Sequence, residues 1–191
     1  MWVRSEYASE LAVLSAWLAA LVPWNVAYHA RAPLDSTVFF VRFALVELQL
    51  RAASEIVVDG EALDVDAALA TQYPGTELLG DFFLTTPPTS ALFYGSGGLG
   101  TAGWIWSLAS LCFLAALALS LALYVREGTV RARLPVSEVR LMGVLLAAGA
   151  LGTAGATVLY YTRREIVGVP IPVGVVVVGI LAAVLLRTER V

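Results

Sequence analysis

Four stretches of about 20 residues without a charged side chain constrain the fold more than any other feature of the sequence. A helix of about 20 apolar residues, at roughly 1.5 Å rise per residue, crosses the roughly 30 Å hydrocarbon core of a bilayer. A soluble domain of 191 residues that carried all four stretches would expose a large apolar surface. We therefore predict a mainly α, integral membrane fold, a bundle of four transmembrane helices. The expected spans are 11–28, about 101–124, 141–161 and about 169–186.

Charged residues make up 14% of the chain and hydrophobic residues 59%, whereas soluble domains carry about 25% charged residues. The formal net charge is -3, and no run of basic residues is long enough to follow a phosphate backbone. The composition therefore argues against nucleic acid as a partner. Cys112 is the single cysteine. It cannot form a disulfide within the chain, and its apolar neighbours indicate a small buried hydrophobe.

Local signals mark the start of the third span and decide how the first is interpreted. Ser137 is placed as the N-cap of the third span, with Glu138 in the first turn. The first apolar segment could also be interpreted as a secretory signal peptide, because Arg4 precedes an apolar run. Glu6 and Glu10 are unusual in the basic start of a signal peptide. We therefore expect this segment to be retained as a membrane helix.

The distribution of arginine predicts the orientation of the chain in the membrane. Short cytoplasmic loops carry an excess of basic residues, and the loop between the second and third spans is rich in arginine. This pattern predicts a multi-pass protein of the plasma membrane with both termini in the cytoplasm. Arg163 and Arg164 then fall outside, against the rule. The arginines that set the orientation are Arg4, Arg126, Arg131, Arg133, Arg140, Arg187 and Arg190.

Composition divides the chain into 1–28, the first helix, 29–100, an extracytoplasmic acidic domain, and 101–191, three helices with a short Arg-rich cytoplasmic loop. The middle part holds nine carboxylates against three arginines. Its segment 46–51 alternates apolar with polar residues, as a half-buried strand does. An Asp-Gly pair between apolar runs at 56–63 is typical of a hairpin. We therefore expect a small antiparallel sheet between the first two helices.

Two helical alternatives stay open in the middle part. An interfacial helix over 38–50 competes with the strand, because Phe39, Phe43 and Val46 also recur at helical spacing. A short helix is a further prediction for 66–72.

Two motifs of the middle part have a functional and a plain interpretation. Residues 95–100 have the spelling G-x-G-x-x-G, but no acidic residue follows up to Val125, so we interpret them as a flexible entry into the second helix. The densest group of carboxylates could bind a hard cation. Its spacing does not match an EF-hand loop, and a solvated acidic surface is favoured. This group is Asp59, Glu61, Asp64 and Asp66.

The sequence offers no catalytic or metal centre. His29 is the only histidine, and without further nitrogen or sulfur ligands it predicts an interfacial anchor rather than a zinc site. No nucleophile, base and orienting acid come together in the sequence. We therefore predict a non-enzymatic protein with no catalytic residue, cofactor or metal.

Polar and small residues within the spans leave room for two further roles. No span contains an ionisable residue, which argues against proton-coupled transport. A neutral-solute path lined by Asn25, Ser107 and Thr153 stays open. Stripes of small residues predict close packing within the bundle, with a homo-oligomer as the lesser alternative. The stripes are Ala148, Gly152 and Ala156 in the third span and Gly179 and Ala183 in the fourth.

Three short segments resemble a group of small uncharacterised membrane proteins of halophilic archaea. They are Met-Trp-Val-Arg-Ser-Glu-Tyr at 1–7, Pro-Trp-Asn at 23–25 and Phe-Phe-Val-Arg-Phe at 39–43. The resemblance covers most of the chain and implies a plasma-membrane location, without an activity. In topology the chain is also similar to the claudin class of adhesion proteins. It lacks the paired loop cysteines and the Gly-Leu-Trp signature of claudins, so no claudin residue is carried over.

These observations lead us to expect an integral membrane protein whose outer domain contacts a protein partner, cell-surface component or ion while the bundle contacts membrane lipid. A small transporter or channel, or a subunit of one, is the alternative. An enzyme acting on lipid is a third, for which no convergent set of titratable groups is found. The expected interaction residues are Arg163 and Arg164, as partners for the carboxylates of Asp59, Glu61, Asp64 and Asp66.

Overall fold

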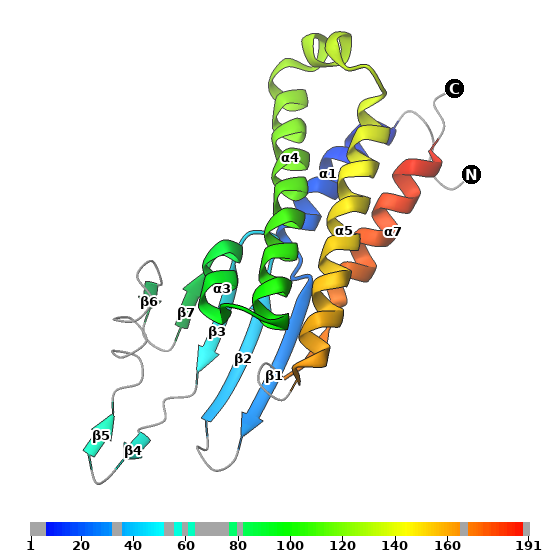
Figure 1. Ribbon diagram of the computed structural model, residues 1–191. Helices are drawn as coiled ribbons and strands as arrows, with labels where there is room; N and C mark the ends of the chain where they lie inside the picture. Colours follow the sequence, from blue (N-terminus) through cyan, green and yellow to red (C-terminus); the bar gives the residue numbers. More distant parts are fainter. Residues whose placement is uncertain are drawn as a thin grey trace.

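The computed structural model describes residues 7–31, 36–51, 56–58, 61–63, 77–79, 82–164 and 168–188. Four helices lie side by side and form a bundle, and a β-sheet extends from one end of it (Figure 1). A fifth helix, α3, is short and lies beside the start of α4. The helices are α1 (Ala8–Leu21), α3 (Pro87–Tyr94), α4 (Gly98–Arg133), α5 (Glu138–Thr162) and α7 (Val173–Arg187).

The sheet joins strands from two distant parts of the chain. Its order is β6-β7-β3-β2-β1-β8, and each neighbouring pair is antiparallel. A separate two-stranded hairpin pairs β4 with β5. The strands are β1 (Asn25–Arg31), β2 (Ser36–Arg42), β3 (Glu47–Arg51), β4 (Ile56–Val58), β5 (Glu61–Leu63), β6 (Glu77–Leu79), β7 (Phe82–Thr85) and β8 (Val169–Ile171).

The predicted strand and hairpin of the middle part are confirmed. Strand β3 matches the alternating segment 46–51 within one residue, and β4 pairs with β5 through Val58 and Glu61, as the hairpin predicts. The interfacial helix considered for 38–50 does not form, because β2 and β3 pair over this stretch. The range 66–72 lies outside the described residues.

The prediction of four transmembrane helices is wrong. Among the described helices, α4 with 36 residues and α5 with 25 are long and apolar enough to cross a membrane. By contrast, α1 has 14 residues and α7 has 15. At about 1.5 Å per residue they extend about 21 and 22 Å, short of the roughly 30 Å hydrocarbon core.

The error arose because two apolar stretches are each divided between a helix and a strand. Pro23 disfavours helical geometry at the residue before it, and Val22 is extended, with φ -81° and ψ 125°. The chain then enters β1. At the other end of the sequence, Pro170 lies in β8, which pairs with β1 on one side only. An edge strand of this kind tolerates proline.

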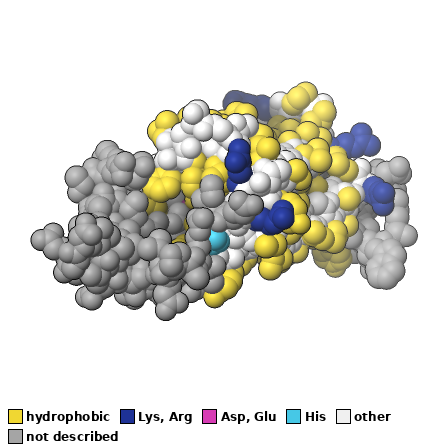
Figure 2. All heavy atoms as spheres, turned by 60° about the horizontal axis from the view of Figure 1, so that its bottom comes forward, with side chains coloured by type: hydrophobic (Ala, Val, Ile, Leu, Met, Phe, Trp, Pro, Cys, Tyr) yellow, Lys and Arg dark blue, Asp and Glu magenta, His cyan; other side chains and the backbone are white. Residues whose placement is uncertain are grey.

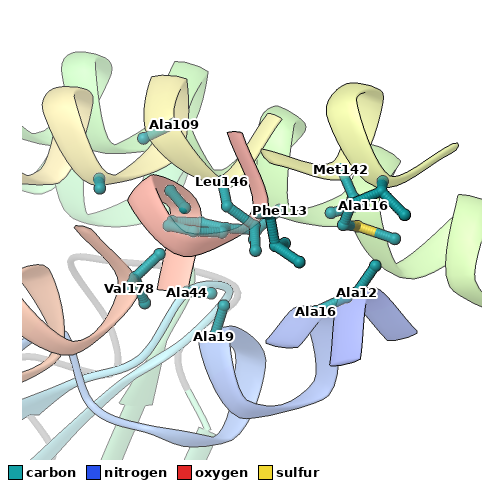
Figure 3. Close-up of a cluster of buried hydrophobic side chains, with 14 of the residues drawn as sticks. Ala12, Ala16, Ala19, Ala44, Ala109, Phe113, Ala116, Met142, Leu146 and Val178 are labelled. Carbon is teal, nitrogen blue, oxygen red and sulfur yellow. The ribbon is translucent and has the colours of Figure 1, made fainter. Parts of the chain in front are cut away.

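Small side chains allow α1 to approach the other helices closely. Ala8, Ala12, Ala16 and Ala19 recur at every third or fourth position and are all buried, so the buried face of α1 consists of alanine together with Ser15. In Figure 3, Ala12, Ala16 and Ala19 point toward a hydrophobic cluster shared with α4, α5 and α7. Larger members of this cluster are Phe113, Met142, Leu146, Val178 and Leu185.

Glycine brings α4 and α5 together. A Cβ on Gly152 would lie 2.8 Å from the Cβ of Ala109, and one on Gly149 would lie 2.6 Å from the ring of Phe113. The predicted role of the small-residue stripe in packing within the bundle is thus confirmed at Gly152. On α7, a Cβ on Gly179 would meet no described atom within 4 Å.

At the end of the bundle away from the sheet, a polar cluster connects α1, α4 and α5. Ser137 caps α5 as predicted, because its side chain accepts a hydrogen bond from the Arg140 N–H at 3.3 Å. The Glu138 carboxylate accepts from the Ser9 hydroxyl at 3.0 Å and pairs with Arg131 Nε at 3.1 Å. Arg131 also donates to the Ser9 hydroxyl at 2.8 Å. The cluster therefore fixes the last turns of α4 to both neighbouring helices.

Replacing Glu138 with Gln is expected to destabilise the protein by about 1–3 kcal/mol, because the nearly buried carboxylate bonds both Ser9 and Arg131. The matched control is Glu127→Gln, which removes an exposed partner of the same Arg131 and is expected to cost about 0–1 kcal/mol. The free energy of unfolding in detergent micelles is measured for both variants. Equal losses in the two variants would contradict the assigned role of Glu138.

Candidate functional site

A row of charged and polar side chains is buried where the sheet meets the bundle. Asn25 on β1 lies opposite Arg42 on β2, which lies opposite Glu47 on β3. The side chains of Arg42 and Glu47 are both 0% exposed, and Asn25 and Gln49 are buried beside them. Charged residues are almost never fully buried unless they are paired, so this row is the most unusual feature of the described residues.

The members of the row bond one another across three strands. Arg42 Nη1 donates to Asn25 Oδ1 at 2.9 Å, and Arg42 Nε forms an ion pair with Glu47 Oε2. Gln49 Nε2 donates to the other oxygen of Glu47. The guanidinium also lies 4.8 Å from the centre of the Phe40 ring and 4.3 Å from that of the Tyr160 ring. Tyr160 belongs to α5, so the guanidinium connects the sheet to the bundle.

The carboxylate of Glu47 keeps Arg42 charged in this buried position. Burial alone would lower the pKa of Arg42, since it disfavours the charged form. The attraction of Glu47, with smaller contributions from Tyr160 and Tyr94, outweighs burial and raises the pKa of Arg42 above its ordinary value. The pair is therefore a buried salt bridge, whose members depend strongly on each other.

The turn between β2 and β3, residues 43–46, inserts into the bundle. Ala44 belongs to the hydrophobic cluster of the helices, and Figure 3 shows it near Ala19 and Val178. Its carbonyl oxygen accepts hydrogen bonds from Ser110 Oγ at 2.6 Å and Trp106 Nε1 at 3.3 Å. A buried carbonyl without partners is costly, so α4 supplies the donors that permit this insertion.

Aromatic residues surround the inserted turn. Trp24, in the link between α1 and β1, donates its Nε1–H to the Phe43 carbonyl at 3.0 Å. The ring of Trp24 lies 5.6 Å from that of Trp106 and 6.3 Å from that of Tyr160. All three rings are almost completely buried. Together they join the α1–β1 link, α4 and α5 around the base of the turn.

Four polar atoms in this region meet no hydrogen-bond partner among the described residues. They are Asn25 Nδ2, Arg42 Nη2, Ser90 Oγ and the Tyr160 hydroxyl. The Tyr160 hydroxyl interacts electrostatically with Ser90 and Arg42. All four atoms can donate, and buried donors bind acceptor oxygens such as that of water.

The predicted interaction residues are not brought together by any described contact. Arg163 follows α5 as its C-cap, and Arg164 places its guanidinium 5.1 Å from the centre of the Tyr161 ring. Asp59, Asp64 and Asp66 lie outside the described residues, and Glu61 is described only as part of the β5 backbone. Pairing of the two arginines with these carboxylates stays a prediction.

The glycine-rich segment forms the turn from α3 to α4. Gly95 and Gly97 have φ of 61° and 126°, values that favour glycine. A Cβ on Gly100 would collide with the Gly95 carbonyl oxygen. These glycines therefore form a tight entry into α4, which confirms the predicted place of the motif, whereas the predicted flexibility of the entry stays a prediction.

The remaining predicted residues have local roles. His29 lies in β1, opposite Val38, and its side chain is half-buried. Within the described residues, no group of three or more His, Cys, Asp or Glu could hold a metal ion. The hydroxyls of Ser107 and Thr153, expected along a solute path, donate to carbonyls of their own helices.

Sequence reasoning missed Arg42 and Glu47 as a pair, since they entered only the count of charges in the middle part and the descriptions of two separate short segments. The available signal was their symmetry, since residues of opposite charge flank the apolar tetrapeptide Phe-Ala-Leu-Val at 43–46. Opposite charges at the base of a tight hairpin face each other across the strands. This pattern could have suggested the pair, but not its burial.

A protein-family model matches residues 1–190, and its description is a family of unknown function, DUF7549. No curated protein matches the chain. The match covers nearly the whole sequence and therefore includes both the sheet and the bundle.

Proposed function

We propose that this chain, which belongs to the DUF7549 family of unknown function, is a membrane-anchored protein that holds a sheet at one bilayer surface for contact with a partner. The inserted turn with its buried Arg42–Glu47 pair carries the proposal. It joins the sheet to the bundle through side-chain contacts as well as through the chain itself. A force that a bound partner exerts on the sheet is therefore transmitted to the helices.

The outer surface of the bundle supports a position in the membrane. Large hydrophobic side chains are exposed on α1, α4, α5 and α7, such as Leu21, Leu108, Leu151 and Ile180. In Figure 2, hydrophobic side chains cover much of the visible described surface. Exposed apolar surface on every helix of a bundle is expected in lipid rather than in water.

Aromatic residues on α4 support a crossing of matching thickness. Trp104 and Tyr124 are exposed, and the helix rises about 30 Å between them at roughly 1.5 Å per residue. This is the thickness of a hydrocarbon core, and exposed Trp and Tyr gather at its two borders. In this arrangement α4 and α5 cross the bilayer, while α1 and α7 pack beside them.

The inserted turn then lies below the outer border of the bilayer. Ser110 follows Trp104 by less than two helical turns, about 9 Å along α4. Non-helical backbone at such depth requires partners inside the protein, and Trp24, Trp106 and Ser110 supply them. In the proposed orientation the sheet is extracytoplasmic and both chain ends are cytoplasmic.

The charge of the outer part suggests the chemistry of the partner. Residues 52–81 contain seven carboxylates and no Arg, Lys or His. A segment of this composition attracts a basic surface and repels an acidic one. We therefore favour a protein partner with a basic face. A solute path receives no comparable support, because Ser107 and Thr153 are bonded within their own helices.

Affinity purification of the tagged protein from its native membrane, with mass spectrometry of bound proteins, tests this function. We expect a partner that is lost at high salt and lost from the variant Asp59→Asn, Glu61→Gln, Asp64→Asn, Asp66→Asn. The control variant Glu10→Gln, Glu127→Gln changes carboxylates at the opposite end and should retain it. Recovery of the same proteins from all three forms, or of none, would refute the proposed interaction.

A further inference from the structure

Four arginines that pair with no described carboxylate gather at the end of the bundle away from the sheet. This basic ring consists of Arg126, Arg133, Arg140 and Arg187. All four are exposed, and none pairs with a described carboxylate. Arg187 ends α7, whose neighbouring Leu186 lies against Gly143 near the start of α5. The ring therefore draws on α4, α5 and α7 at one end of the molecule.

A fifth arginine is shared by two of the nearby acids. Arg131 pairs with Glu127 at 2.7 Å and with Glu138 at 3.1 Å. Of the described carboxylates at this end, only Glu10 forms no ion pair with a described residue. The undescribed residues 1–6 and 189–191 contain one Arg and one Glu each, so their formal side-chain charges balance. The five described arginines at this end therefore outnumber its three described carboxylates, Glu10, Glu127 and Glu138, by two.

The backbone brings these cations to the border of the apolar surface. Tyr124 and Val125 are exposed apolar residues at the end of the straight part of α4. Arg126 then leaves helical geometry, with φ -143° and ψ 51°, and the chain turns across the end of the bundle (Figure 1). Arg131 fixes the turned segment to Ser9 and Glu138. In the proposed membrane position, the ring consequently lies at the border between the hydrocarbon core and the headgroups.

We propose that the basic ring binds the phosphate groups of anionic lipids, an inference that rests on the membrane position proposed above. A guanidinium group donates two parallel hydrogen bonds to phosphate oxygens. Basic residues next to a membrane helix are attracted to anionic headgroups. Free phosphate offers the same oxygens, but a lipid is held at this depth by its tails. The expected ligand is therefore an anionic headgroup, in which no positive group balances the charge of the phosphate.

The test adds phosphatidylglycerol or zwitterionic phosphatidylcholine to the full chain in detergent and records melting temperature and bound lipid by native mass spectrometry. We expect phosphatidylglycerol to raise the melting temperature more than phosphatidylcholine. In Arg126→Gln, Arg133→Gln, Arg140→Gln, Arg187→Gln its apparent affinity should fall at least about tenfold. The control Arg163→Gln, Arg164→Gln, at the opposite end of α5, should keep the wild-type affinity. If the fourfold variant does not fold, the pair Arg126→Gln, Arg133→Gln replaces it.

Three outcomes would overturn the inference. They are equal effects of the two lipids on the wild type, an unchanged phosphatidylglycerol affinity in the ring variant, or the full shift with inorganic phosphate at the same ionic strength. Carbonate extraction of membranes separates this failure from that of the proposed function. A chain that is released by carbonate is not membrane-embedded, whereas a chain that is retained but ignores lipid charge refutes only the basic ring.

Discussion

Replacing Glu47 with Gln is expected to destabilise the protein by about 3–5 kcal/mol, because it leaves the buried, charged Arg42 without its carboxylate. Without the carboxylate, burial lowers the pKa of Arg42, but a guanidinium keeps its proton in proteins near neutral pH, so the charge stays buried without its partner. Gln49, which donates to Glu47, would also lose a charged acceptor. The measurement is the free energy of unfolding in mixed micelles.

The control for this prediction removes both charges together. The double variant Arg42→Met, Glu47→Leu replaces the pair by apolar side chains of similar length, and such exchanges are often neutral or stabilising. We therefore expect it to be more stable than Glu47→Gln alone. A double variant that is less stable than the single one would show that the hydrogen bond of Arg42 to Asn25 and its contact with Tyr160 matter more than the ion pair.

Replacing Trp106 with Ala is expected to cost about 3–5 kcal/mol, since the fully buried ring packs on Trp24 and its loss leaves a cavity. Trp104→Ala is the matched control on the same helix. Trp104 is 50% exposed, so its replacement should cost much less. Chemical unfolding followed by circular dichroism measures both, and equal losses would contradict the assigned packing around the inserted turn.

A second comparison isolates the hydrogen bonds to the turn. The double variant Trp106→Phe, Ser110→Ala keeps most of the apolar volume but removes both donors to the Ala44 carbonyl. An unsatisfied buried carbonyl costs about 1–3 kcal/mol. We expect each single variant to lose less than half of the stability that the double variant loses, because one remaining donor still forms a hydrogen bond with the carbonyl oxygen. Simple additivity would mean that the two donors act independently.

The long helices could be predicted from the sequence because their signals are local. The α4 and α5 segments are apolar over enough residues to span a bilayer, and Ser137 and Glu138 mark the start of α5 by ordinary capping. The same count of apolar residues wrongly predicted membrane-spanning helices at α1 and α7. There the apolar stretch continues into a strand, and the strand partners lie far away in the sequence, as β1 and β8 do. Hydrophobicity alone does not separate a helix from a buried strand.

The candidate site was hidden for a related reason. Arg42 and Glu47 are charged residues in an acidic region, which by composition belong to a solvated surface. Their burial depends on the turn between them entering the bundle. That entry in turn depends on donors from Trp106 and Ser110, about 60 positions later. No pattern within one segment contains this information.

The inserted turn also determines the order in which the protein can be assembled. The turn precedes α4 and α5 in the chain, yet its Ala44 is enclosed by side chains from those helices. The helices therefore cannot close on one another first and receive the sheet afterwards. The turn must already be in place when the helical segments close on it, so the packing of the bundle and its attachment to the sheet are one step. A chain arrested before that step would leave the alanine face of α1 and the glycines of α5 open to premature association with other helices.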